Sequence, residues 1–462
     1  MMFENFFTFR TQRHRVSFEI IRKRDFPQLD RQAHTYLDYT GGGLYAIPQI
    51  EKHQKLLRES VFGNPHSINP TSSLSTALVE ETREKVLSFF NATDEYDCIF
   101  TANASGALKI VGECFPFDEK SAFVLSKDNH NSVLGIKEKA QKKGAKVNFL
   151  ELTPDLQIDK SDFLKALEEV DHYDTKLLAY PAQSNYSGVK HSLQMVREAK
   201  EKGFYVLLDA AAFTPSNLLD LKDVPADFVC ISFYKMFGYP TGIGCLLVRK
   251  ETCCKLQKDY FAGGTVKVAS TYDQTYALHQ NHEKFEDGTI NYNQIPALKI
   301  GLEYLESIGM PRIQLQIQKN SRQFTGALSD IRHQNGSPLI KIIGPSDMEV
   351  RGNTIAFHIL DSLGQRIDLE QIEQDALRFN ISLRTGCFCN PGADECYHQL
   401  KRPEVKELLD AIEINNVTKI QQLKRKRGAV RISVGMITNE KDLMTLLNFL
   451  NNYLLADARN AA

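Results

Sequence analysis

A lysine stands in an unusual place in this chain. Lys235 lies in the segment SFYKMFGYPTGIG, just after a short apolar run that ends at Ser232 and before a glycine-rich turn. Its aromatic neighbours would exclude water from the ammonium group, and loss of water lowers the pKa of a lysine. An amine that is neutral near pH 7 can attack a carbonyl carbon and form a Schiff base. The alternative is a surface lysine whose alkyl chain packs on those aromatic rings.

An acidic residue ends another apolar run. Asp209 closes the segment YVLLD, and open α/β sheets bind ligands at the carboxyl ends of their strands. A carboxylate there either caps the following turn or pairs with a buried cation, such as the ring nitrogen of pyridoxal phosphate (PLP). Asp209 precedes Lys235 by about one strand–helix–strand step. The two residues together therefore predict a PLP site more strongly than either does alone.

Further polar groups are expected at the same edge. The segment FTANASGALKIVG leads from a strand to a helix through small residues, so the backbone amides of Ala104 and Ser105 could face a phosphate. Ordinary capping of the helix would explain the same residues. His130 and Asn185 each follow an apolar run. Because the carboxyl ends of parallel strands meet at one edge of a sheet, we expect all of these groups to lie together.

The elements that hold these groups follow from the alternation of short apolar runs with amphipathic stretches. Helices are expected at stretches such as Ser132–Lys143 and Leu193–Lys202, each followed by a glycine. This alternation is typical of an α/β fold with a mostly parallel sheet. The seven apolar runs expected to form its strands are 98–101, 122–126, 146–150, 176–180, 205–209, 227–231 and 244–248.

The pattern changes after Pro311. A long polar helix, followed by strands near 354–359 and 429–434, predicts a second, smaller α+β domain. Residues 395–428 are rich in Lys, Glu and Arg. We interpret them as a solvated helical insertion rather than as a docking site for a partner. The expected bounds are 36–305 for the large domain, 1–35 with 306–462 for the small domain, and about 395–428 for the insertion.

Composition limits the partners. Of 462 residues, 42% are hydrophobic and 24% are charged, as in folded soluble proteins, and 56 Lys plus Arg balance 57 Asp plus Glu. No net field would attract nucleic acid or an anionic membrane. Nine unevenly spaced cysteines do not resemble a secreted disulfide framework, and neither an export signal nor a run of eighteen apolar residues is visible. We therefore expect a cytoplasmic protein.

An ordered series of motifs resembles a known family. The segments ANASGA, DNHNS, QSNYSG, LLDAAA and SFYKMFGYPTGIG resemble the cysteine desulfurase group of the class V aminotransferases, and the match covers nearly the whole chain. Segments such as YLDYTGGGLY, FAGGTV, RTGCFCNPGA and VRISVG most resemble the N-terminal domain of molybdenum cofactor sulfurases. The resemblance implies fold type I of the PLP-dependent transferases, with a seven-stranded sheet, and a homodimer.

The resemblance also implies roles around the cofactor. Lys235 would form the Schiff base with PLP, Asp209 would pair with its ring nitrogen, and His130 would stack on the ring and move a proton. The other contacts would come from Asn185 to the phenolic oxygen, from Ala104, Ser105 and Ser232 to the phosphate, and from Thr265 of the neighbouring subunit.

Two arginines and a cysteine would act on the substrate. By the same resemblance, Arg431 would bind the substrate carboxylate with support from Arg384, because a guanidinium fork fits a carboxylate. Cys389 would take sulfur from L-cysteine as a persulfide, leaving alanine, and pass it to a separate acceptor, either a protein or a small molecule. Nearby positive charge would favour its thiolate. If the loop is extended, Cys387 and Cys389 point to opposite faces, so only one should face the cofactor.

Several alternatives remain open at this point. Related PLP enzymes include C–S lyases of modified cysteines, and a non-catalytic scaffold would use the charged insertion. A dinucleotide-dependent oxidoreductase is disfavoured because no G-x-G-x-x-G opens the first strand–helix turn. Zinc binding by Cys387, Cys389 and Cys396 is a weak hypothesis, since C-x-C-x6-C lacks a nearby histidine pair; we expect no metal. Ala212 and Tyr234 also depart from many cysteine desulfurases, which have Gln or His at the first position and His at the second.

Overall fold

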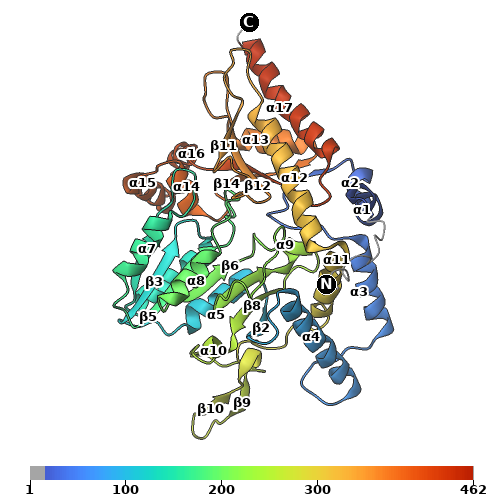
Figure 1. Ribbon diagram of the computed structural model, residues 1–462, viewed down its shortest axis with the longest axis vertical. Coiled ribbons are helices and arrows are strands. Elements are labelled where there is room, and N and C mark those ends of the chain that lie inside the picture. Colours follow the sequence, from blue (N-terminus) through green and yellow to red (C-terminus); the bar gives the residue numbers. More distant parts are fainter. Residues whose placement is uncertain (1–15, 461–462) are drawn as a thin grey trace, which may run out of the picture.

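A seven-stranded sheet and a four-stranded sheet form the body of this molecule, and helices pack on each of them (Figure 1). The computed structural model describes residues 16–460. The N-terminal stretch 1–15, in which the sequence shows no export signal, lies outside the described residues. Among the residues that are described, no helix is both long and apolar enough to cross a bilayer.

The larger sheet has seven strands in the order β2-β8-β7-β6-β5-β3-β4, and only β8 runs antiparallel to its neighbours. All seven expected strands are confirmed, and their ends agree within two residues. Their bounds are β2 Tyr96–Thr101, β3 Ser121–Ser126, β4 Lys146–Leu150, β5 Thr175–Pro181, β6 Tyr205–Asp209, β7 Phe228–Ser232 and β8 Gly244–Arg249.

Helices cover both faces of this sheet, which is why its strands read as continuous apolar runs. Neighbouring residues of β5 pack into different cores: Leu177 lies with α5 and α6, whereas Leu178 lies with α4, α7, α8 and α11. The expected helices are confirmed, since α6 and α8 end just before Gly144 and Gly203, whose φ angles are 87° and 78°. The bounds are α4 Pro70–Phe89, α5 Ala104–Cys114, α6 Asn131–Lys142, α7 Lys160–Glu169, α8 Gln194–Glu201 and α11 Ile295–Ile308.

The smaller sheet has the order β11-β12-β15-β14 and is antiparallel. The long helix α12 packs on it, and the expected strands at 354–359 and 429–434 correspond to β12 and β15. The bounds are β11 Ile340–Ile343, β12 Thr354–Ile359, β14 Arg384–Gly386, β15 Ala429–Ser433, α12 Met310–Ser329, α13 Leu369–Arg378 and α17 Glu440–Asn460. A two-stranded parallel ladder joins β1 (Thr35–Tyr36) to β13 (Ile381–Ser382).

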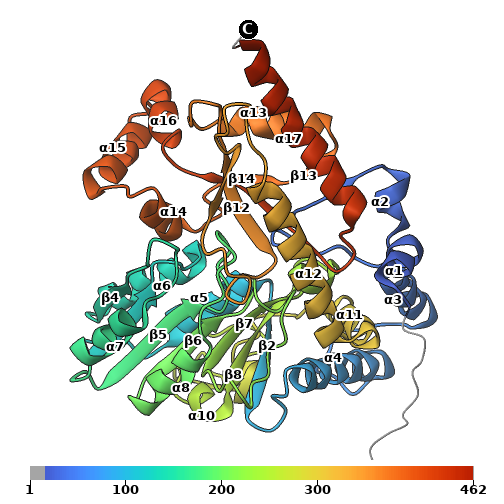
Figure 2. The ribbon, with the colours of Figure 1, turned by 45° about the horizontal axis from the view of Figure 1, so that its top comes forward.

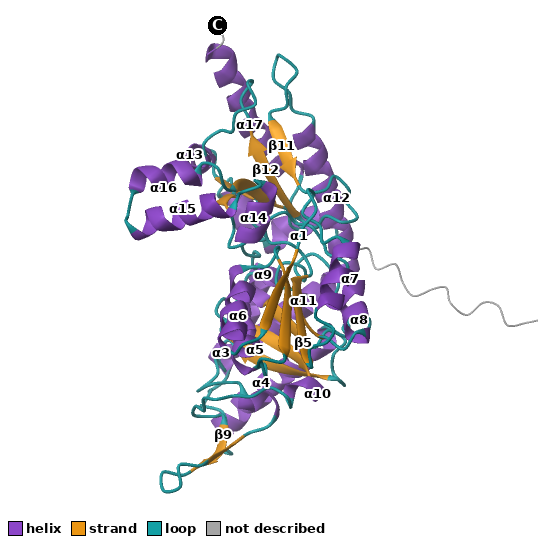
Figure 3. Cartoon of the chain, turned by 90° about the vertical axis from the view of Figure 1, so that its left-hand side faces the viewer, coloured by secondary structure: helices purple, strands orange, loops and turns teal. Residues whose placement is uncertain are grey.

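Two features project from this frame. Figure 2 shows α14 (Pro391–Tyr397), α15 (Arg402–Glu413) and α16 (Val417–Lys424) on one side of the smaller sheet, opposite α12 and α17. These helices occupy the stretch expected to be a helical insertion, and the pair α15–α16 stands away from the body in Figure 3. A hairpin of β9 (Val266–Ala269) and β10 (Tyr276–Leu278) projects from the lower end in the same view.

Short elements complete the chain. The helix α9 directly follows β7 and carries Lys235, so it sets the position of this lysine at the edge of the larger sheet. The bounds are α1 Phe18–Asp25, α2 Pro27–Arg31, α3 Ile47–Glu59, α9 Phe233–Phe237, α10 Lys250–Cys253 and the 3-10 helix Asn281–Lys284.

Candidate active site

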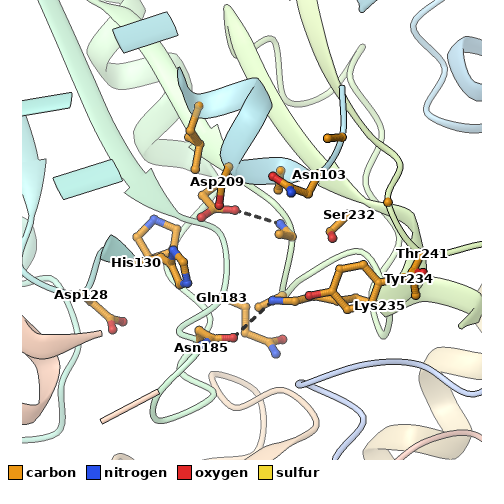
Figure 4. Close-up of a pocket in the computed structure, with 18 residues that line it drawn as sticks. Asn103, Asp128, His130, Gln183, Asn185, Asp209, Ser232, Tyr234, Lys235 and Thr241 are labelled. Carbon is orange, nitrogen blue, oxygen red and sulfur yellow. Dashed lines mark hydrogen bonds between the residues drawn. The ribbon is translucent and has the colours of Figure 1, made fainter. Parts of the chain in front are cut away.

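A cavity of about 340 Å³ lies at the carboxyl edge of the larger sheet. It brings together most of the residues that the sequence singles out, from five different strand ends and the helices that follow them (Figure 4). The expected residues that line it are Ala104, Ser105, His130, Asn185, Asp209, Ser232 and Lys235.

Lys235 lies in the surroundings that its sequence predicts. The neighbouring side chains of Phe233, Met236 and Phe237 are buried, and the lysine itself is accessible only in part, at the cavity that it lines. Its Nζ donates to Asn185 Oδ1 at 3.4 Å. Burial lowers the pKa of Lys235 to about 8, although the carboxylate of Asp209 opposes this shift. A substantial neutral fraction of this amine is therefore available near pH 7 to 8.

Asp209 and His130 lie on the same side of the cavity (Figure 4). Asp209 is nearly buried at the end of β6, and its Oδ1 accepts from the amide of Ala211 at 3.0 Å. His130 caps α6, because its Nδ1 accepts from the amide of Ser132 at 3.1 Å. This bond leaves Nε2 as the nitrogen that carries the proton in the neutral ring. Burial lowers the pKa of His130 while Asp209 opposes the shift, so the neutral ring is favoured.

The start of α5 offers free backbone donors at the other end of the cavity. Asn103 caps this helix by accepting from the amide of Gly106 at 3.0 Å. Within the described residues, the amides of Ala104 and Ser105 have no acceptor. A side chain at Gly244 would begin 2.6 Å from the carbonyl carbon of Asn103, so glycine is required there for this close approach. The free amides at a helix start suit a phosphate.

The donor set therefore fits PLP. An amine with a lowered pKa, a nearly buried carboxylate and a helix start with free amides line one cavity. The aldehyde, the ring nitrogen and the phosphate of PLP each need one of these groups. Ala212 and Tyr234, the two departures from many cysteine desulfurases, line the same cavity.

Two arginines lie beside this cavity and share one carboxylate. Arg431 and Arg384 face each other on β15 and β14. Asp38 accepts from Arg384 Nε at 2.7 Å and from Arg431 Nη2 at 3.1 Å. Arg431 Nη1 also donates to the carbonyl of Asn185 at 2.9 Å, while its buried Nε has no partner within residues 16–460. Burial lowers the pKa of Arg431 to about 10, against the opposing effect of Asp38. Not all N–H donors of Arg431 are used in these bonds, although its side chain is almost fully buried and does not line the cavity.

Sequence reasoning missed Asp38. It follows β1 in the segment YLDYTGGG, where an acidic residue between apolar ones and before three glycines was the available signal. A side chain at Gly41 would begin 2.4 Å from Asp38 Oδ2, so glycine is needed for the chain to turn around this carboxylate. Asp38 lowers the net positive charge of the arginine pair.

The cysteine loop is bonded through three successive carbonyls. The carbonyl of Cys387 accepts from Asn390, that of Phe388 from Asn185 Nδ2 at 2.7 Å, and that of Cys389 from Asn131 at 2.8 Å. The loop is not extended, because Phe388 and Cys389 have φ angles of 52° and 57°, so the alternation of side chains along an extended loop does not decide which cysteine faces the cofactor.

The two cysteines of the loop differ in their exposure to solvent. Cys389 is exposed, whereas Cys387 is half-buried beside Asp394. The guanidinium of Arg431 lies 4.5 Å from the centre of the Phe388 ring and within electrostatic reach of Cys389. Of the two cysteines of this loop, the exposed Cys389 is therefore the one more open to a reaction partner.

Asp128 is the second functional candidate that sequence reasoning missed. It is fully buried after β3, and its carboxylate accepts from Ser184 Oγ, His191 Nε2 and Asn390 Nδ2, each at 2.7 Å. Asp128 thus fixes the position of Asn390, the residue that follows Cys389. An acidic residue after an apolar strand, the signal used for Asp209, would have found it.

Four expected residues do not line the cavity: Arg384, Arg431, Thr265 and Cys389. Arg431 donates to Asn185, which lines the cavity, and Arg384 is joined to Arg431 through Asp38. Thr265 is buried near the hairpin, where its Oγ1 donates to the carbonyl of Ala262 at 2.9 Å. Within residues 16–460, no group of three or more His, Cys, Asp or Glu side chains could hold a metal ion, so the zinc hypothesis gains no support.

Comparison with known proteins identifies the family. The pattern of the family "Aminotransferase class-V" matches residues 35–446. The chain belongs to this family. The resemblance drawn from the motifs is therefore confirmed, and a PLP-dependent enzyme is indicated.

Sequence relatives and a solved structure show which members of the family this class V aminotransferase resembles. It is 34% identical to a molybdenum cofactor sulfurase of Arabidopsis thaliana, over 93% of this chain and 57% of that protein, and 35% identical to the one of Homo sapiens, over 93% and 50%. The chain spans about half the length of these relatives. A cysteine desulfurase of Thermococcus onnurineus has the same fold, with a TM-score of 0.78 at 24% identity over 94% of this chain and 98% of that one.

Proposed function

We propose that this class V aminotransferase is a PLP-dependent cysteine desulfurase. It would convert L-cysteine to L-alanine and leave the sulfur as a persulfide on Cys389, from which a separate acceptor protein or small molecule takes it. The observation that carries the proposal is that Lys235, Asp209 and the free amides at the start of α5 line one cavity, and that Asn185 in its wall is hydrogen-bonded both to Arg431 and to the cysteine loop at Phe388. The sequence relatives named molybdenum cofactor sulfurases support the same chemistry.

The cofactor would lie between the two ends of the cavity. Lys235 would bind its aldehyde, Asp209 its ring nitrogen, and the amides of Ala104 and Ser105, with Ser232, its phosphate. Asn185 would face the phenolic oxygen and His130 the ring. When bound, PLP accepts the electron pair that is released when a proton leaves the α-carbon of the substrate.

Binding and proton transfer are assigned to residues at the cavity. Arg431 would hold the substrate carboxylate through its unused donors, while Asp38 keeps Arg431 and Arg384 in place. The neutral amine of Lys235 would then take the proton from the α-carbon. His130 would hold or move a proton at Nε2, because its Nδ1 already accepts from a backbone amide.

Sulfur transfer would begin at Cys389. Its thiolate attacks the sulfur of the substrate, an S–S bond forms, and the C–S bond breaks with its electron pair left on the carbon side. With the proton that this carbon gains, one L-cysteine and one thiol give one L-alanine and one persulfide.

Replacement of Cys389 by Ala tests the sulfur step. We expect Cys389→Ala to retain the absorbance of bound PLP and to lose persulfide formation from L-cysteine by at least a hundredfold, because no other exposed thiol is described at this loop. The persulfide is measured by mass spectrometry after alkylation, and alanine by chromatography. Cys254→Ala, which removes another exposed thiol, is the matched control. Undiminished sulfur transfer in Cys389→Ala would remove Cys389 from this role and favour a C–S lyase.

We also propose a cytoplasmic homodimer in which Thr265 contacts the phosphate of the neighbouring subunit. The hairpin β9–β10 supports this assembly, since it projects from the body and exposes Val268, Tyr272 and Tyr276. Exposed apolar side chains on a projecting hairpin are typical of a subunit contact.

A further inference from the structure

A second cavity lies outside the site described above. Its volume is about 590 Å³, larger than that of the first cavity, and no residue lines both. Its walls come from β11, β12 and the turn after it, from the C-terminal end of α14, and from the loop 152–154 after β4. It therefore lies where the smaller sheet meets the edge of the larger one.

The charge of this cavity is one-sided. Lys341 and Arg366 line it, whereas no Asp or Glu does among the described residues. In the same part of the chain, neither cation has a carboxylate within ion-pair distance. Arg366 donates instead to the carbonyl of Arg425 at 2.7 Å, and Lys341 Nζ lies 5.9 Å from the centre of the Tyr397 ring. Positive charge that the protein does not neutralise attracts an anion into a concave site.

Two histidines form part of the polar wall, His358 buried and His398 half-buried. His398 Nδ1 donates to the carbonyl of Asp394 at 2.9 Å, so its Nε2 carries the lone pair in the neutral ring. His358 Nε2 lies 3.1 Å from the carbonyl of Gly428 and 3.3 Å from His398 Nε2, so it must carry a proton to donate. The lone pair of His358 is then on Nδ1, for which the described residues provide no donor. Burial, reinforced by Arg366, lowers the pKa of His358 to about 3 and keeps this ring neutral.

The rest of the wall is mixed, with Thr153 and Gln399 as polar members and several apolar side chains. Leu152, Pro154 and Leu360 line the cavity beside the ring of Tyr397. A volume of this size, with polar groups on its wall and an apolar part beside an aromatic ring, suits a small organic molecule better than a bare ion.

We propose that this second cavity binds a small organic anion with a phosphate or carboxylate group. The anionic group lies between Lys341 and Arg366, the body lies against Tyr397 and the apolar side chains near it, and a donor group of the ligand reaches His358 Nδ1. The site is independent of the proposed desulfurase chemistry. Because α14 begins at Pro391, two residues after Cys389, and ends at this cavity, an occupant would contact the helix that follows the cysteine loop.

Cys396 provides a reporter inside this cavity. It lines the wall and is half-buried, so an occupant should shield it from a neutral reagent. With PLP bound at the first site, the rate of alkylation by iodoacetamide is measured at each cysteine by mass spectrometry, without added anion, with inorganic phosphate and with acetate. We expect either anion to slow alkylation of Cys396 at least about threefold while the exposed Cys254 is unaffected. Protection by phosphate alone, or by acetate alone, identifies the anionic group that the site prefers.

Variants decide whether the cavity is responsible. The double variant Lys341→Gln/Arg366→Gln should lose the protection. The matched control Lys319→Gln/Arg322→Gln removes two exposed cations of α12 that do not line the cavity, and it should keep the protection. Thermal unfolding of both variants shows whether they are folded. The proposal is overturned if neither anion protects Cys396 in the wild-type protein, or if the protection persists in Lys341→Gln/Arg366→Gln.

Discussion

At the scale of single residues, the electrostatics of the candidate site depend on Asp38. Its carboxylate accepts from both Arg384 and Arg431, and it lies close enough to raise the pKa of Lys235 while both arginines lower it. The same carboxylate thus orients the groups expected to bind the substrate and influences the amine expected to bind the cofactor.

Replacement of Asp38 by Asn tests this coupling. Asp38→Asn removes a negative charge of similar size and shape, so we expect the pKa of Lys235 to fall below about 8, by about 0.5 to 1 unit. The pH dependence of Lys235 acylation in the cofactor-free protein, mapped by mass spectrometry, measures this midpoint. Asp442→Asn is the matched control, because Asp442 is also buried and paired with an arginine, Arg22, at 2.6 Å. A midpoint that stays in place in Asp38→Asn would show that Asp38 has only a structural role.

At the residue scale, the surroundings of a side chain could be predicted from sequence where the signal was local. Lys235 and Asp209 each follow an apolar strand, and their neighbours in the chain predict their surroundings. Asp38 was missed because its partners are distant in sequence, 346 and 393 residues away. No local pattern indicates such a pair, so its recognition required the fold.

At the scale of elements, the cysteine loop depends on contacts with the larger sheet. The strands of the larger sheet could be predicted because helices cover both of its faces, so that each strand is a continuous run of apolar residues. The conformation of the loop could not, because Phe388 and Cys389 adopt φ angles near 55°, which non-glycine residues seldom take without support. The support comes from Asn131, Asn185 and Asp128, all on other elements.

Replacement of Asp128 by Asn should loosen this loop. The variant removes a buried charge from three hydrogen bonds, so we expect a decrease of about 2 to 4 kcal/mol in the free energy of unfolding. We also expect the half-buried Cys387 to react faster with a neutral alkylating reagent, while Cys254 does not change. Denaturant titration and mass spectrometry measure the two effects. Unchanged values in both would mean that the loop does not depend on this carboxylate.

At the scale of the whole molecule, the division of the chain into a large domain over 36–305 and a small domain from its remaining parts stays a prediction. The seven-stranded and four-stranded sheets are separate. The arginine pair lies on the four-stranded sheet, and the cysteine loop follows strand β14 of that sheet. The candidate site therefore requires both sheets to be in place.

The proposed homodimer makes a specific prediction for mixed subunits. If Thr265 serves the site of its neighbour, Lys235→Ala and Thr265→Ala proteins should each be impaired, Thr265→Ala most clearly at limiting PLP. Refolding them together should restore activity up to about one quarter of the wild-type value, since half of the random dimers contain one intact site. Alanine formation from L-cysteine is measured for each protein and for the mixture. Activity of the mixture no higher than the mean of the two separate variants would contradict this arrangement.

The most direct test of the account concerns Lys235 itself. The protein is incubated with PLP, reduced with borohydride and digested, and the modified lysine is located by mass spectrometry. Because Lys235 combines a pKa lowered to about 8 with a position at the cavity that also holds Asp209, the account predicts one stoichiometric modification, at Lys235, and its loss in Lys235→Ala. Modification of a different lysine, or none in folded protein that has been given PLP, would contradict it.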